Sequence, residues 1–128
     1  MRGMSRGDER EAGSGGFKGK PTIRTIKLEK FLVELAIGGI NSDTDPMAER
    51  EFDFELGMRP HILGKTLSWD DRKKILVVQV VIESIDESSA AKQMAEEIFE
   101  VASAILKSVD GLNVRVKTSR QLKTGEDL

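Results

Sequence analysis

The chain contains no cysteine and only one histidine, His61. The absence of cysteine excludes disulfides, thiolate zinc sites and a cysteine nucleophile. A transition-metal site would have to be built from oxygen ligands around His61, and no such cluster is visible in the sequence. We therefore expect neither a metal nor another cofactor.

Long apolar runs are also missing. No stretch reaches the roughly 18 apolar residues that a membrane-spanning helix needs, and the first twenty residues have no apolar core of a signal peptide. We expect a cytoplasmic protein with no membrane partner. Asparagine and glutamine together number five, while 33% of the residues are charged, a composition typical of heat-adapted proteins.

The length of the chain and the change in composition along it predict one domain with two polar ends. The 128 residues suit a single domain. Residues 1–20 hold six glycines and almost nothing to bury, so we expect a flexible arm there. The folded domain should span 21–119, and residues 120–128 should form a frayed tail.

Two early segments favour strands. Residues 22–37 are rich in β-branched side chains, with a change of parity that indicates a bulge near Glu29 and Lys30. In residues 51–58, apolar side chains alternate with acids, which is the pattern of a half-buried strand. The acids at 49, 51, 53 and 55 would then form an outer face opposite Arg115 and Lys117.

The second half of the chain gives the clearest signals. A short strand is expected over 62–69. Residues 75–85 form a strand that is apolar on both faces, with Leu76 and Val78 facing one way and Ile75, Val77 and Val81 the other way. Residues 88–109 show apolar positions at spacings of three and four, which predicts a helix that ends before Gly111. A last strand follows over 112–117.

These elements predict an α+β fold. We expect a mainly antiparallel sheet of four to five strands, in the order β-β-β-β-α-β, with one long helix at about 88–109 packed on one face. One helix covers only one face of a sheet. The second apolar face of the 75–85 strand must therefore be covered by a fold of the sheet or by another subunit.

The stretch GGINSDTDPMAE, residues 38–49, is the main candidate for a metal-binding loop. Asn41, Asp43 and Asp45 have the spacing of the first three ligands of a calcium loop. However, Pro46 replaces the glycine required at the sixth position, and Phe52 replaces the bidentate glutamate at the twelfth. The sequence therefore favours a connector with an Asx turn and a proline-started helical turn.

Two further positions are candidate binding residues. His61 follows Arg59 and Pro60, and the two side chains could act as an acid–base group with an anion clamp. No carboxylate lies beside them in sequence, although Asp70 or Asp71 could approach. Trp69 is either an interaction hot spot or a cover for the edge of the core.

The N-terminal arm is the candidate site for nucleic acid. Residues 1–30 carry eight basic and four acidic side chains, so a flexible cationic arm could follow phosphates. Its basic residues within 1–20 are Arg2, Arg6, Arg10, Lys18 and Lys20. Phe17 is the one aromatic residue there, which does not support base stacking.

Three hypotheses of function result. The first is a non-catalytic interaction or assembly protein, homo-oligomeric, that binds itself, a peptide or another protein through the apolar sheet face. Its expected binding residues are Ile75, Val77, Val81, Trp69, Arg59 and His61. The second is a nucleic-acid-binding protein that uses the arm. The third is a small enzyme that uses His61 with Arg59 and an acid.

Overall fold

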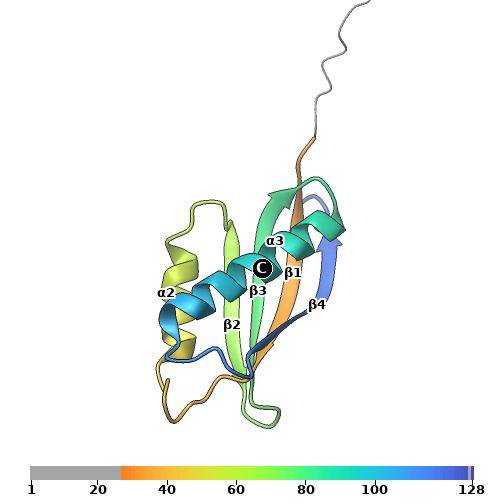
Figure 1. The fold of residues 1–128 in the computed structure, drawn as a ribbon. Coiled ribbons are helices and arrows are strands. Elements are labelled where there is room, and N and C mark those ends of the chain that lie inside the picture. The colour runs from red at the N-terminus through yellow and green to blue at the C-terminus, as the bar shows by residue number, and fades with distance from the viewer. Residues whose placement is uncertain (1–26, 127) are drawn as a thin grey trace, which may run out of the picture.

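The computed structural model describes residues 27–126 and 128 of the chain. Four strands and two helices follow one another along the described residues (Figure 1). The elements are β1 (Glu29–Gly38), α2 (Ala48–Gly57), β2 (Gly64–Asp70), β3 (Ile75–Ser84), α3 (Glu87–Ile105) and β4 (Asn113–Gln121). The predicted arm, residues 1–20, lies outside the described residues, as do residues 21–26 at the start of the predicted domain.

All four strands form one antiparallel sheet in the order β2-β3-β1-β4. β1 and β2 are therefore parallel to each other with β3 between them, and β3 and β4 are parallel with β1 between them. This is the split β-α-β arrangement, in which a helix links each parallel pair. The α+β class and the antiparallel sheet of four strands confirm the coarse prediction.

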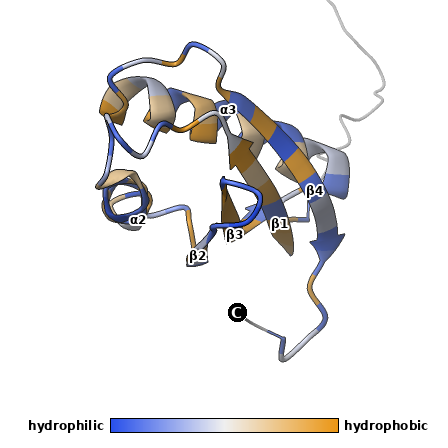
Figure 2. Ribbon diagram, turned by 90° about the horizontal axis from the view of Figure 1, so that it is seen from below, coloured by the Kyte–Doolittle hydropathy of each residue, from blue (hydrophilic) through white to orange (hydrophobic). Residues whose placement is uncertain are grey.

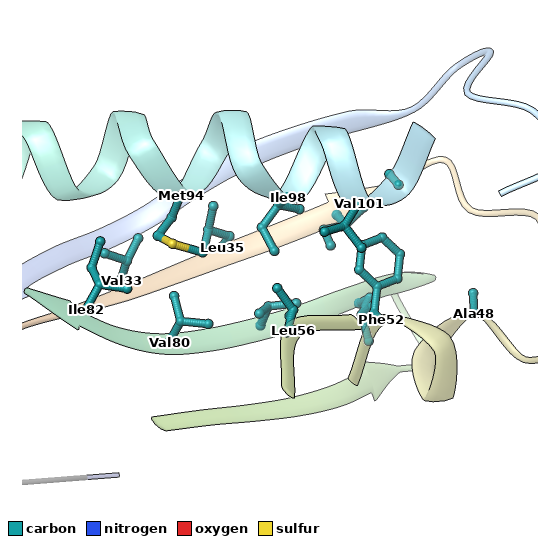
Figure 3. Packing of buried hydrophobic residues seen from close by; sticks show 14 of the residues in the cluster. Val33, Leu35, Ala48, Phe52, Leu56, Val80, Ile82, Met94, Ile98 and Val101 are labelled. Carbon is teal, nitrogen blue, oxygen red and sulfur yellow. The ribbon is translucent and has the colours of Figure 1, made fainter. Parts of the chain in front are cut away.

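Both helices pack on the same face of the sheet (Figure 2). The core between them is formed by Val33 and Leu35 of β1, Val80 of β3 and Met94 of α3, all with no exposed surface. Figure 3 shows Met94 and Ile98 pointing from α3 toward the strands. The residues between these core positions along β1 and β3 point to the other side, because side chains alternate along a strand.

The predicted strand at 51–58 is wrong, because this segment is helix α2. Phe52 and Leu56 are completely buried, whereas Phe54 is 64% exposed. Figure 3 shows Phe52 reaching from α2 toward Val101 of α3. Positions 52 and 56 satisfy the period of a strand and that of a helix equally well. Burial against α3 selected the helix, so the observed order is β-α-β-β-α-β with two helices in place of one.

The change at α2 also removes the predicted acidic strand face. The acids at 49, 51, 53 and 55 now project from a helix, and Asp53 pairs with Lys65 of β2. Lys117 of β4 pairs instead with Glu34 of β1, with 3.6 Å between Nζ and Oε2. The irregularity near β1 lies in its pairing with β4, between Glu34 and Leu35, and not at the predicted position of 29–30.

Helix α3 confirms the predicted long helix but ends earlier than residue 109. It begins at an N-cap, Asp86, whose Oδ1 accepts a hydrogen bond from the backbone N–H of Ser89 at 2.7 Å. This bond holds the pKa of Asp86 below its ordinary value of 3.8. The helix stops at Ile105, and the backbone N–H of Lys107 donates to the carboxylate of Asp45. This contact attaches the loop before α2 to the end of α3.

Candidate functional site

The face of the sheet that the helices leave uncovered, here called the open face, carries the predicted interaction residues Ile75, Val77 and Val81. The buried side chains of Leu76 and Val78 lie on the helix side of β3, so the odd-numbered residues of this strand point to the open face. The predicted binding strand is therefore apolar on both faces, as the sequence indicates.

A row of hydrogen bonds crosses the middle of the open face. The Thr66 hydroxyl donates to Gln79 Oε1 at 2.9 Å, and Gln79 Nε2 donates to Glu34 Oε1 at 3.3 Å. Lys117 then pairs with the other oxygen of Glu34. This row, here called the polar belt, links all four strands from β2 to β4. Because its members satisfy one another, it can be covered at a lower cost than isolated polar groups.

The polar belt divides the open face into two apolar patches. The Val77 patch consists of Ala36, Ile75 and Val77, and the pairs Ala36–Val77 and Gly38–Ile75 place it near the C-terminal end of β1. The Val81 patch consists of Leu32 and its partner Val81. Ile75, Val77 and Leu32 are partly exposed, so each patch offers apolar surface to a partner.

The end of the chain lies over the Val81 patch. Leu122 is 9% exposed, and its backbone N–H donates to the carbonyl of Lys30 at 2.9 Å. Arg120 binds both oxygens of Glu126 through NH1 and NH2, at 3.2 and 3.1 Å. A Cβ added to Gly64 would lie 3.4 Å from Leu128 Cδ1 and 3.8 Å from Val81 Cγ2, which places the Leu128 side chain beside β2 and β3.

Figure 2 places the end of the chain on the side of the sheet opposite the helices. The predicted domain boundary at 119 falls inside β4, which continues to Gln121. The fraying of residues 120–128 stays a prediction.

Trp69 does not belong to the open face. It pairs with Leu76 in the sheet and packs partly buried against the core on the helix side. It also lines a hollow of about 210 Å³ together with Ile40 and Ala48. The structure thus separates Trp69 from Val77 and Val81 by the thickness of the sheet.

Arg59 and His61 converge on a carboxylate that the sequence analysis did not name. Glu97 of α3 is 7% exposed and accepts from Arg59 NH1 at 3.1 Å, while its other oxygen lies 2.7 Å from His61 Nε2. Asp70 and Asp71 instead hold the β2–β3 turn, where they bond the backbone of Arg72 and the side chain of Lys74.

The chemistry of this cluster follows from the carboxylate. An ionised Glu97 only accepts hydrogen bonds, so His61 must carry a proton on Nε2, which leaves Nδ1 as the atom available to another group. The cluster borders a shallow hollow of about 360 Å³ that Gln93, Glu96 and Glu100 also line. Its geometry suits proton transfer, and it also fastens the α2–β2 connection to α3.

A signal for Glu97 was present in the sequence. Ala90, Met94, Glu97 and Val101 follow one another at spacings of four, three and four, and the other three are buried in the core. An acid on the apolar stripe of a helix needs a partner, because an unpaired buried charge is costly. Arg59 and His61 lie opposite that acid because helix α2 leads the chain to α3, and the sequence predicted a strand in place of this helix.

Within the stretch 38–49, residues 39–47 form a connector between β1 and α2, and residues 48 and 49 already belong to α2. Asn41 Oδ1 accepts from the backbone N–H of Asp43 at 2.9 Å, so the Asx turn is centred on Asn41. The carboxylate of Asp45 is engaged with Lys107. Among the residues that the structure describes, no group of three or more histidine, cysteine or acidic side chains could hold a metal ion.

The basic arm of the nucleic-acid hypothesis lies outside the described residues, so that hypothesis stays a prediction. Recognition of single-stranded RNA on a sheet face uses aromatic side chains as stacking platforms. The open-face positions of β1 and β3 carry aliphatic, amide and charged residues instead, and Phe31 of β1 is buried on the helix side. Within the described part of the chain, no helix is long and apolar enough to cross a membrane.

Comparison with known proteins gives no family for the chain: no protein-family model, no curated protein and no solved structure matches it.

Proposed function

We propose that this protein is a non-catalytic assembly module that pairs with a second copy of itself through the open face of its sheet. The observation that supports the proposal is that β3 is apolar on both sides, while both helices pack on only one of them. The split β-α-β arrangement occurs with many unrelated functions, so the proposal rests on this face and not on the fold.

The size of the open face suits a weak pair. Four strands about 4.8 Å apart and up to ten residues long give a face of about 600 Å². Two such faces would bury about 1,200 Å² in total, at the lower limit for specific interfaces. We therefore expect association in the micromolar range, because a small interface leaves little surplus over the entropy lost on binding.

The charges at one end of the face favour a particular two-fold axis. In the register of the sheet, Asp70 of β2 lies opposite Ile75, and Arg115 of β4 lies opposite Ala36. Both side chains therefore lie on the open face at its Val77 end, one at each edge of the sheet. An axis parallel to the strands brings the β2 edge of one copy over the β4 edge of the other. Asp70 of each copy then faces Arg115 of its partner, whereas an axis across the strands would place both groups over the opposite, Val81 end of the partner's face, where this pairing is lost.

Sedimentation velocity between about 5 and 200 µM tests the proposal, at concentrations chosen for a weak interface. We expect the mass to rise with concentration from one chain to two. Val77→Lys should abolish the rise because it places a charge in a buried apolar part of the interface, and Arg115→Glu should weaken it. Phe54→Lys is the matched control, because Phe54 is exposed on α2 away from the open face. Equal behaviour of all three variants and the wild type would contradict the proposal.

A second candidate function, proton-transfer catalysis at His61, is favoured by the convergence of His61, Arg59 and Glu97. Hydrolysis of p-nitrophenyl acetate is a suitable probe, since it reports a basic imidazole nitrogen. We expect His61→Ala to lower the rate because it removes the imidazole, and Glu97→Gln to lower it because it removes the carboxylate that orients the ring. Rates unchanged from the wild type would exclude this candidate.

A further inference from the structure

The segment that crosses the Val81 patch, residues 122–126 and 128, is here called the strap. Its two leucines, Leu122 and Leu128, lie against opposite strands of the patch. Leu122 is bonded to the backbone of β1, and Leu128 lies beside Gly64 of β2 and Val81 of β3. The strap thus bridges the face from the β4 edge to the β2 edge.

A specific anchor holds the strap in this position. The planar guanidinium of Arg120 binds both oxygens of Glu126, which is the strongest geometry for such a pair. The backbone N–H of Lys123 also donates to Glu126, at 2.8 Å. Between them the chain turns at Gly125, whose φ of +89° is a conformation that other residues rarely adopt. An unstructured end would need neither the anchor nor this turn.

The strap and a second copy compete for the same space. Two sheets that pack face to face lie about 10 Å apart, and their own side chains fill that distance. A peptide layer on the Val81 patch therefore prevents the close approach of another sheet. With that patch covered, about half of the estimated contact area remains, which is less than a specific interface needs.

From these observations we infer that the strap is a built-in competitor that occupies the open face in the single chain and must leave it before two copies pair. This inference rests on the proposed function, because it concerns the regulation of the same face. The strap also indicates the chemistry that the Val81 patch accepts: an extended segment that presents leucine side chains.

The affinity of pairing should depend on how often the strap is open. Both straps must leave before a pair forms, so the apparent dissociation constant rises with the inverse square of the open fraction. If each strap is open about a third of the time, its release should tighten pairing roughly ten-fold.

Sedimentation velocity on full-length variants measures this effect. Glu126→Gln breaks the anchor, and Leu128→Asp removes the apolar contact beside Gly64. Thr124→Ala is the control, because Thr124 is an exposed residue of the same segment. We expect the concentration at which half of the chains are paired to fall roughly ten-fold in both strap variants and to stay at the wild-type value in the control.

Two outcomes would overturn the inference, and they differ in what else they affect. If the wild type pairs and the strap variants pair at the same concentration, the strap is not a competitor, and the proposed function stands. If neither the wild type nor the strap variants pair at any concentration up to about 200 µM, pairing itself fails and the inference fails with it.

Discussion

Replacement of Glu97 by alanine should destabilise the fold more than any other change of a single acid on α3. The variant removes two hydrogen bonds, at 3.1 Å to Arg59 and 2.7 Å to His61, from a carboxylate that is 7% exposed. A fully buried pair would cost about 3–5 kcal/mol when broken. Here water can reach the partners, because the side chains of Arg59 and His61 are 32% and 44% exposed.

We therefore expect Glu97→Ala to lower the free energy of unfolding by about 2 kcal/mol, and Glu97→Gln, which keeps the shape, by about 1 kcal/mol. For a domain of this size, 2 kcal/mol lowers Tm by roughly 10 °C. Urea unfolding, followed by circular dichroism and by the fluorescence of Trp69, measures the change. Glu96→Ala is the matched control, because Glu96 is the exposed neighbour on the same helix.

A free energy of unfolding for Glu97→Ala within about 0.5 kcal/mol of the wild-type value, the range of ordinary surface substitutions, would contradict a stabilising role of this carboxylate. A double-mutant cycle with Arg59→Ala separates the pair from the rest of the cluster. We expect a coupling energy above about 0.5 kcal/mol, because groups in direct contact do not act additively.

Three further predictions test the elements that position the open face. Phe52→Ala should cost about 3–5 kcal/mol in urea unfolding and Phe54→Ala less than about 0.5, because only the first is buried; equal costs would contradict helix α2. Gly39→Ala should lower the free energy of unfolding by at least about 2 kcal/mol, since a Cβ there would lie 2.7 Å from the carbonyl carbon of Gly111. Gly111→Ala, with open space around the added Cβ, should lower it by about 1 kcal/mol. Calorimetry distinguishes the two values. The backbone hydrogen bond that lowers the pKa of Asp86 stabilises the fold above pH 3.8 and is lost as the pH falls below that value, so Asp86→Ala should lower Tm at pH 7 and have a smaller effect at pH 3; an equal effect at both would contradict the cap.

The sequence was sufficient to predict those elements in which the spacing of apolar residues fits either a strand or a helix, but not both. In β3, apolar residues on both faces predict a central strand, and in α3 a long stripe at spacings of three and four predicts a helix. In α2 the signal is ambiguous, because residues 52 and 56 are two strand periods apart and also about one helical turn apart. The alternating acids favoured the strand, and only the packing of Phe52 against α3 decided between the two.

The candidate site was predicted unevenly for a related reason. Ile75, Val77 and Val81 share a face by the alternation of one strand, which a sequence shows directly. The contact between His61 and Glu97 joins residues 36 positions apart, so it depends on how α2 and α3 are placed. The strap was missed because its residues are polar except for Leu122 and Leu128, and its position depends on the Arg120–Glu126 pair rather than on an apolar pattern.

The mass of the protein in solution tests the central claim most directly. Sedimentation velocity should be run on the wild type, on Glu126→Gln and on Val77→Lys over the same range of concentration. The proposed pairing predicts that the first two reach twice the 14.2 kDa of one chain, Glu126→Gln at the lower concentration, and that Val77→Lys remains at 14.2 kDa. A mass of one chain at every concentration, in both the wild type and Glu126→Gln, would contradict it.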